Sequence, residues 1–167
     1  MTTIEEARQR VQDERRHRDG IVCPCCEQLC KTYRRVLNAQ MARFLIWLAK
    51  YSIQEGGYNI EDGGRWVGID RFPLIQRRPG GGDFAKLRFW ELIEEMGNDD
   101  SSKRTSGIWR ITPLGMAFAT GKMRVPAAVF IYNNKLDGKS DVPITIHQAL
   151  GTKFSYDALW HGALADR

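Results

Sequence analysis

The chain has 167 residues, of which 43% are hydrophobic and 27% charged, which fits one ordinary globular domain or a compact domain with a small one attached. The longest apolar run, Phe44 to Ala49, is far shorter than the roughly 20 residues that cross a bilayer, and the polar start MTTIEEARQR lacks an apolar signal-peptide core. We therefore expect a cytoplasmic protein without a membrane partner, whose net charge of +5 and pI near 9.2 suit a nucleic-acid partner without requiring one.

Residues 1–35 are predicted to form a helix followed by a cysteine turn. The stretch TTIEE places two threonines three residues before two glutamates, which is a capping-box pattern at a helix start. Ile4, Ala7 and Val11 form a thin apolar stripe on the helix that should follow, and this helix is expected to end near Gly20. Residues 21–33 then read as a strand, a turn and a second strand.

The turn holds all four cysteines of the chain, Cys23, Cys25, Cys26 and Cys30. Cytoplasmic thiols stay reduced, so free thiols or metal thiolates are expected rather than disulfides. Cys23 and Cys26 have the spacing of a zinc knuckle, but a structural zinc needs four ligands and the chain has no second C-x-x-C. The remaining ligands would be Cys30 with Cys25 or His17, or a knuckle from a second subunit; a metal-free turn of reduced thiols is the other interpretation.

Residues 36–124 are predicted to be the main domain. Its expected elements are, in chain order, a helix capped by Asn38 and ended by Gly56-Gly57, a strand over Trp66–Ile69, a short helix over Arg71–Gln76, a helix over Phe84–Met96 capped by Asp83, the loop GNDDSSKRTSG, the strand IWRIT, and a helix from Pro113 to Ala119. The Phe84–Met96 helix is expected to bury Ala85, Phe89, Leu92, Ile93 and Met96.

This order resembles a winged helix-turn-helix. The stretch IWRITPLGMAFA resembles the strand that closes the wing in MarR- and PadR-type repressors, with Ile111, Thr112 and Gly115 at the corresponding places. The resemblance implies an α+β fold with a winged-helix core and DNA binding in transcription regulation, usually as a dimer. The whole chain also resembles a group of small bacteriophage and prophage proteins with a C-P-x-C turn and stretches like NAQMARFLIWL and KRTSGIWRITPLG, which implies an origin and no activity.

The basic residues expected to contact DNA lie on the Phe84–Met96 helix and on the wing. The second helix of a helix-turn-helix enters the major groove, and here its first turns carry Lys86 and Arg88. Three glutamates follow on that helix, which phosphates would repel. Residues 101–124 contain five basic residues and no acidic one, among them Lys103, Arg104, Arg110 and Lys122. A second basic island consists of Lys31, Arg34, Arg35 and Arg43, and whether the two islands share a face is open.

Residues 125–167 are predicted to form a β-hairpin and a short helix. VPAAVFIYNN reads as a strand, KLDGKSD as the turn, VPITI as the return strand, and Thr145 as the cap of a helix that Gly151 ends. The tail that follows is aromatic, with Phe154, Tyr156 and Trp160, and is expected either to pack on its own domain or to bind a partner.

An enzyme is not expected, because none of the three histidines lies in a recognisable metal or nucleophile motif and RRPGGGD lacks the ending of a phosphate-binding loop. Two functions are consistent with the sequence. The first is a DNA-binding regulator. A homodimer and a bound zinc ion are further expectations for it. The alternative is a winged-helix scaffold that binds a host or phage protein, which suits the acidic later part of the Phe84–Met96 helix and the aromatic tail.

Overall fold

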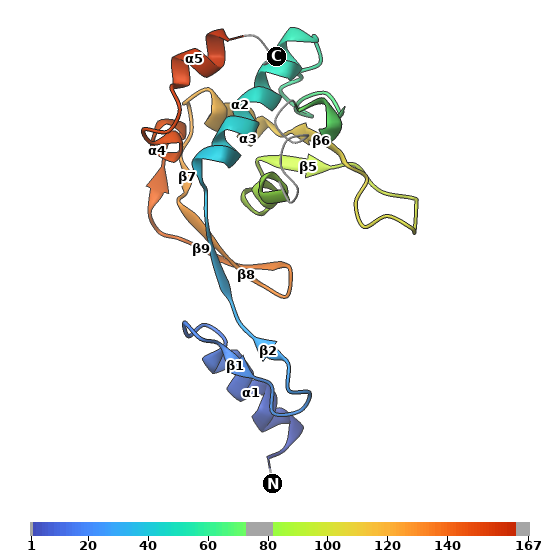
Figure 1. Cartoon of the computed structure of the whole chain (residues 1–167), viewed down its shortest axis with the longest axis vertical. Helices are drawn as coiled ribbons and strands as arrows, with labels where there is room; N and C mark the ends of the chain where they lie inside the picture. Colours follow the sequence, from blue (N-terminus) through green and yellow to red (C-terminus); the bar gives the residue numbers. More distant parts are fainter. Residues whose placement is uncertain (1, 73–81, 163–167) are drawn as a thin grey trace. The chain divides into compact units, whose positions relative to one another are not determined.

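The computed structural model describes residues 2–72 and 82–162, and it has the mixed α+β character that the sequence predicts. The chain divides into two compact units (Figure 1). Unit 1 consists of residues 1–36 and 128–141, and unit 2 of residues 37–127 and 142–167. The segment expected as one C-terminal hairpin is therefore shared between the units. Within the described ranges, no helix combines the length and the apolar character needed to span a membrane.

Unit 1 contains one helix and two small antiparallel sheets. Its elements are α1 (Ile4–Glu14), β1 (Ile21–Val22), β2 (Leu29–Cys30), β3 (Tyr33–Val36), β8 (Ala128–Tyr132) and β9 (Lys135–Lys139). Strand β1 pairs with β2, so the predicted strand, cysteine turn and strand are confirmed. Strand β8 lies between β3 and β9.

The capping box of α1 is confirmed, because the Thr3 side chain accepts the Glu6 N–H while the Glu6 carboxylate accepts the Thr3 N–H. The predicted end near Gly20 is wrong, since α1 ends at Glu14 and residues 15–20 form successive turns. Gly20 has φ +70°, and a Cβ there would lie 2.6 Å from the carbonyl oxygen of Cys30. Glycine therefore permits the close passage of this turn beside β2.

The predicted turn over KLDGKSD is also wrong, because residues 135–139 of that stretch form β9. The reversal occurs at Asn133 and Asn134, whose φ angles of 48° and 59° are both positive. A two-residue turn with positive φ at both positions matches the twist of a hairpin, and asparagine tolerates that conformation. The Asp137-Gly138 pair, which the sequence suggested as the turn, instead lies inside β9.

Unit 2 is built around one long helix. Its elements are α2 (Ala39–Gln54), β4 (Val67–Gly68), the 3₁₀ helices η1 (Ile69–Arg71) and η3 (Gly82–Trp90), β5 (Ile93–Glu95), β6 (Ile108–Ile111), α3 (Pro113–Ala119), β7 (Val125–Pro126), β10 (Pro143–Ile144), α4 (Ile146–Leu150) and α5 (Tyr156–His161). The N-caps predicted at Asn38 and Thr145 are confirmed, as is the helix from Pro113 to Ala119. Of the short helix expected over Arg71–Gln76, only the first two residues lie inside the described ranges.

The aromatic tail packs on its own unit through α5. The Lys50 side chain is buried in α2, and its ammonium donates to the carbonyl oxygens of Leu159 and Gly162 at 2.7 and 2.6 Å. The Tyr156 hydroxyl donates to the Ala119 carbonyl oxygen at 2.9 Å. A cation at the carboxyl end of a helix satisfies carbonyl groups that have no partner within the helix.

The helix expected over Phe84–Met96 is not formed, and this is the largest difference from the prediction. Residues 82–90 form a 3₁₀ helix and residues 93–95 form β5, which pairs with β6. A 3₁₀ helix has three residues per turn, so Phe84, Leu87 and Trp90 share one face, and the last two are only 0% and 2% exposed. Glu91, at φ +61°, then redirects the chain into the strand.

Candidate nucleic-acid interface

The loop between β5 and β6 carries two of the expected DNA contacts, Lys103 and Arg104, and Figure 1 shows it extending away from the sheet. Asp100 orders the loop by accepting the Ser102 N–H at 3.0 Å and the Ser102 hydroxyl at 2.6 Å, and these bonds lower the pKa of Asp100, the hydroxyl most strongly. Lys103 Nζ lies 3.8 Å from Asp100 Oδ2. Asp99 and Asp100 thus offset the two cations of the loop, and both basic side chains are exposed to solvent.

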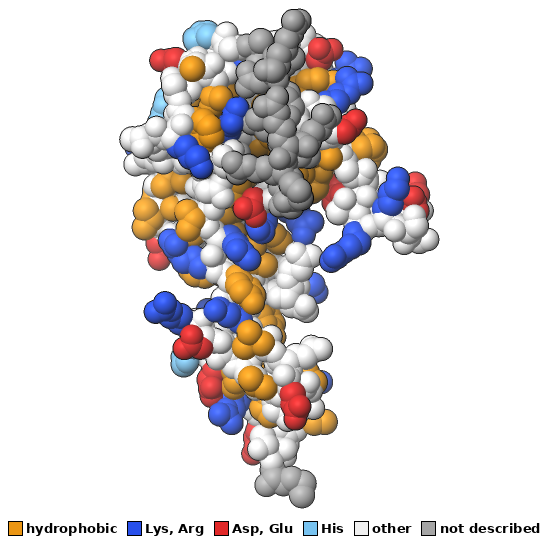
Figure 2. Space-filling model, viewed as in Figure 1, with side chains coloured by type: hydrophobic (Ala, Val, Ile, Leu, Met, Phe, Trp, Pro, Cys, Tyr) orange, Lys and Arg blue, Asp and Glu red, His pale blue; other side chains and the backbone are white. Residues whose placement is uncertain are grey.

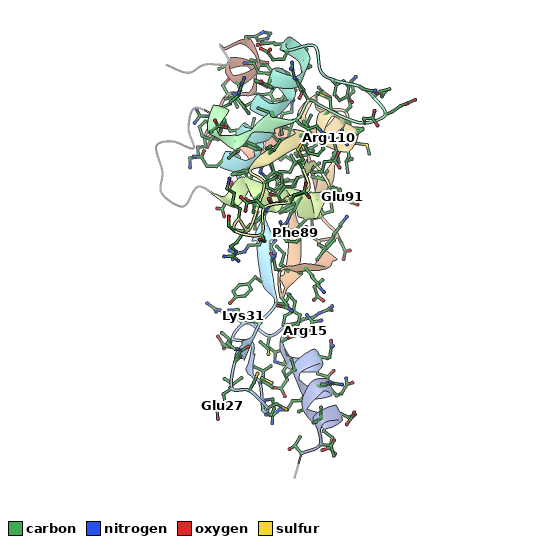
Figure 3. All side chains as sticks on the ribbon, turned by 90° about the vertical axis from the view of Figure 1, so that its right-hand side faces the viewer. Arg15, Glu27, Lys31, Phe89, Glu91 and Arg110 are labelled. Atoms are coloured by element: carbon green, nitrogen blue, oxygen red, sulfur yellow. The ribbon has the colours of Figure 1, made fainter. Side chains whose placement is uncertain are left out.

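Most of the other residues expected to contact DNA in unit 2 already interact with neighbouring side chains. Arg110 forms an ion pair with Glu94 across β5 and β6, and its guanidinium carbon lies 4.4 Å from the centre of the Trp66 ring. Lys86 forms an ion pair with Asp83, and the Arg88 guanidinium carbon lies 4.9 Å from the centre of the Phe89 ring. Figure 3 shows Arg110, Glu91 and Phe89 within this unit. Lys122, after α3, is exposed.

Unit 1 contains an open cavity of about 710 Å³ with a strongly basic lining. Its lining residues are Arg16, His17, Arg18, Lys31, Thr32, Tyr33, Arg34, Phe130, Asp137, Gly138 and Lys139. Five of these side chains are permanently cationic and only one is a carboxylate. On the face drawn in Figure 2, Lys and Arg side chains occur over both units.

Asp137, the one carboxylate among the described residues that line the cavity, is already paired with arginines. Asp137 accepts from Arg15 at 2.9 Å and from Arg16 at 3.2 Å. The hydrogen bond from Arg15 is the main reason why the pKa of Asp137 is lowered, and the same bond raises the pKa of Arg15. The remaining cations of the lining therefore give the cavity a positive potential that favours anions.

Arg15 itself forms the structural support behind the cavity. Its guanidinium donates to the Thr32 hydroxyl at 2.9 Å and lies 4.2 Å from the centre of the Tyr132 ring. The Thr32 N–H also donates to the Arg15 carbonyl oxygen at 2.7 Å. In Figure 3, Arg15 and Lys31 lie where the chain passes from the cysteine turn into β3.

The sequence prediction included Lys31 and Arg34 in a basic island but missed Arg16, Arg18 and Lys139. The run ERRHRD over residues 14–19 was the available signal for the first two. Lys139 could not be found from sequence spacing, because strand pairing through β8 brings β9 to the same sheet as β3.

The cysteine turn has the backbone of a tight knuckle. The Cys23 N–H donates to the Gln28 carbonyl oxygen at 2.8 Å, the Glu27 N–H donates to the Cys23 carbonyl oxygen at 3.0 Å, and Glu27 has φ +59°. The N–H groups of Cys25 and then Cys26 donate to the Cys23 sulfur, and these bonds lower the pKa of the Cys23 thiol.

All four cysteines are free. Cys25 and Cys26 are exposed, whereas Cys23 and Cys30 are half-buried. A hydrogen bond with Cys30 is the main reason why the pKa of Tyr132 is raised. In the parts of the chain described, no group of three or more His, Cys, Asp or Glu side chains is arranged to hold a metal ion.

Comparisons of the sequence with protein-family models and with curated proteins, and of the structure with solved structures, give no match.

Proposed function

We propose that this protein binds nucleic acid through its phosphate groups, with the basic cavity of unit 1 as the main contact site. The observation that carries the proposal is the lining of that cavity, in which five cationic side chains surround one carboxylate that is already paired with Arg15 and Arg16. Lysine and arginine side chains that displace counterions from phosphates supply most of the affinity in such binding.

Unit 2 is proposed to add a second phosphate contact as a winged-helix core. Its chain order of α2, β4, η3, the β5–β6 hairpin and α3 supports that assignment, and Lys103 and Arg104 in the hairpin loop would contact the backbone as a wing. Because residues 82–90 form a 3₁₀ helix, we do not assign Lys86 and Arg88 to reading bases in the major groove. The proposed setting is a DNA-binding regulator of phage or prophage type in the bacterial cytoplasm.

The test is a salt titration of binding to fluorescently labelled DNA, once as a duplex and once as a single strand. Each lost phosphate contact lowers the slope of log affinity against log salt by roughly 0.9, so Lys31→Ala with Arg34→Ala should lower it by almost two. Lys103→Ala with Arg104→Ala tests the loop separately. Arg8→Ala is the matched control, because Arg8 is an exposed cation of α1 outside the cavity lining. Absence of binding at low salt to both the duplex and a single strand of the same length would refute the proposal.

A protein-binding scaffold is the second candidate function. The contacts of three cations favour this function. Within unit 2, Arg110 and Lys86 already form ion pairs and Arg88 already lies against an aromatic ring. A pull-down from bacterial lysate, with and without nuclease, separates the two functions. Capture of one protein that survives both nuclease and high salt would support the scaffold, and loss of captured partners after nuclease treatment would support nucleic-acid binding.

Zinc at the cysteine turn is a further part of the proposal. The positive φ of Glu27 and the N–H groups directed at the Cys23 sulfur support a knuckle in which Cys23 and Cys26 face one ion. Since no group of three or more His, Cys, Asp or Glu side chains among the described residues is arranged to hold a metal ion, we propose that the site is completed by the same pair from a second copy. Such a site would also make the protein a homodimer.

A further inference from the structure

The cavity of unit 1 has an aromatic floor in addition to its cationic rim. Phe130 lies in the central strand β8, directly opposite Arg34 of β3 and Gly138 of β9. Residues that are directly opposite in antiparallel strands place their side chains on the same face of the sheet. Arg34, Phe130 and Gly138 therefore lie side by side on one face, and all three line the cavity.

Gly138 leaves one side of the Phe130 ring uncovered. A Cβ built at Gly138 would lie 3.7 Å from Phe130 Cδ2, which is ordinary contact distance, so a larger side chain at this position would cover the ring edge without a backbone clash. Phe130 is half-buried in the present arrangement. The floor of the cavity thus offers an aromatic apolar surface beside Arg34.

Tyr33 places a second aromatic ring at the edge of the cavity, because it precedes Arg34 in β3 and its side chain lies on the opposite face of the sheet from Phe130. It lines the cavity, it is 45% exposed, and Lys31 Nζ and Arg35 Cζ lie 5.6 and 5.4 Å from the centre of its ring. Aromatic rings interleaved with lysine and arginine in a groove are the combination with which proteins bind unpaired nucleic-acid strands, since the rings stack on bases while the cations contact phosphates.

We infer that the cavity binds single-stranded nucleic acid, with an unpaired base stacked on Phe130 and the adjoining phosphates held by the cationic rim. This inference rests on the proposed function and specifies its ligand. Bases in a duplex are covered on both faces by their neighbours and cannot stack on a protein ring without leaving the helix. A cavity of about 710 Å³ is of the size that holds a small ligand, so an unpaired nucleotide unit fits within it.

The experiment compares three ligands by fluorescence anisotropy: a labelled oligothymidylate, a labelled duplex with the same number of phosphates, and unlabelled thymidine monophosphate as competitor. The oligothymidylate should bind at least about fivefold more tightly than the duplex. Thymidine monophosphate at the same nucleotide concentration should not displace it, because one phosphate uses only part of the rim. Displacement would instead identify a free nucleotide as the ligand and overturn the inference.

Two variants test the floor without changing any charge. Phe130→Leu keeps an apolar side chain but removes the flat ring, and Gly138→Val covers the ring edge with a residue that strands accept. Each should weaken oligothymidylate binding about fivefold or more and leave duplex binding unchanged. Phe89→Leu is the matched control, because Phe89 is a half-buried phenylalanine beside an arginine in unit 2.

The outcomes separate this inference from the proposed function. Equal affinity for single strand and duplex, or wild-type affinity of both floor variants, would overturn the single-strand assignment while salt-dependent binding still supported the function. If neither nucleic acid bound at low salt, both would be wrong. Circular dichroism of each variant establishes folding, and Gly138→Val alone decides the outcome should Phe130→Leu fail to fold.

Discussion

Arg15 Nη2 and Asp137 Oδ1 lie 2.9 Å apart and join the end of α1 to β9, 122 positions further along the chain. The side chains are only 9% and 16% exposed. Because Arg15 also donates to Thr32 and lies over Tyr132, one guanidinium connects the helix, the link between β2 and β3, and the β8–β9 hairpin. The relationship explains how a unit with small sheets keeps a defined cavity, whose lining includes Asp137.

Asp137→Asn should therefore destabilise unit 1. The substitution leaves the Arg15 guanidinium almost buried without a counter-charge, and breaking such a pair costs about 3–5 kcal/mol when both groups are fully buried, so we expect a loss near the lower end. Amide hydrogen exchange measured peptide by peptide should show faster exchange in β3, β8 and β9. Asp141→Asn is the control, as the same change at an exposed carboxylate of the same unit. Equal exchange in the two variants would contradict the prediction.

The same pair predicts a specific pH dependence. The pKa of Asp137 is lowered in the folded chain, whereas unfolded aspartate has its ordinary value of about 3.9. Its contribution to stability is thus complete above about pH 4 and is lost as the pH falls from there through the folded pKa, because the unfolded chain binds the proton first. Arg15 stays charged throughout, since its pKa is raised. The stability difference between wild type and Asp137→Asn should shrink on acidification below about pH 4; a difference independent of pH would show that another group controls acid unfolding.

Local signals in the sequence were sufficient for much of the fold. The capping residues Thr3, Asn38 and Thr145 act within three positions of the groups they bind, so their helices could be predicted without tertiary information. The site could not be predicted in this way. Asp137 and Lys139 reach the cavity through strand pairing and an ion pair, and the sequence gives no spacing rule for either interaction.

The segment over residues 82–96 shows a second kind of limit. Its apolar residues fit a period of 3.6 as well as the observed period of three followed by a strand, and only packing decides between them. Leu92 and Ile93 are consecutive and both buried. They lie where the chain turns at Glu91 from the 3₁₀ helix into β5. The helical pattern was therefore a reasonable prediction that tertiary structure overrode.

The two arrangements of residues 82–96 make opposite predictions for Leu87 and Phe89. In the 3₁₀ helix Leu87 is fully buried, so Leu87→Ala should lower the free energy of unfolding by about 2–5 kcal/mol. Phe89 is half-buried beside Arg88, so Phe89→Ala should cost less despite removing a larger side chain. Urea denaturation followed by tryptophan fluorescence measures both, since all five tryptophans belong to unit 2. The reverse order of effects would support an α-helix with Phe89 in the core.

The last prediction concerns Cys23 and Cys26. Two thiolates held by one tight turn supply half of a tetrahedral zinc site, and the described part of one chain shows no group of three ligand side chains arranged around an ion. Two copies of the turn would supply four thiolates and share one ion. Protein purified without chelator should therefore contain one zinc ion per two chains and sediment as a dimer. EDTA should convert it to monomer and lower its melting temperature.

Substitution separates this shared site from the other arrangements of the cysteines. Cys23→Ser and Cys26→Ser should each abolish zinc and the dimer, because each removes two of the four sulfurs. Cys25→Ser should leave both unchanged, as its exposed side chain is not needed by a ligand set of Cys23 and Cys26. One zinc per monomeric chain would show that Cys30, Cys25 or His17 completes the site within one copy. Metal-free protein whose melting is the same in EDTA and in the Cys23→Ser variant would show that the turn folds through its backbone hydrogen bonds alone, with Cys23 as a thiol of lowered pKa.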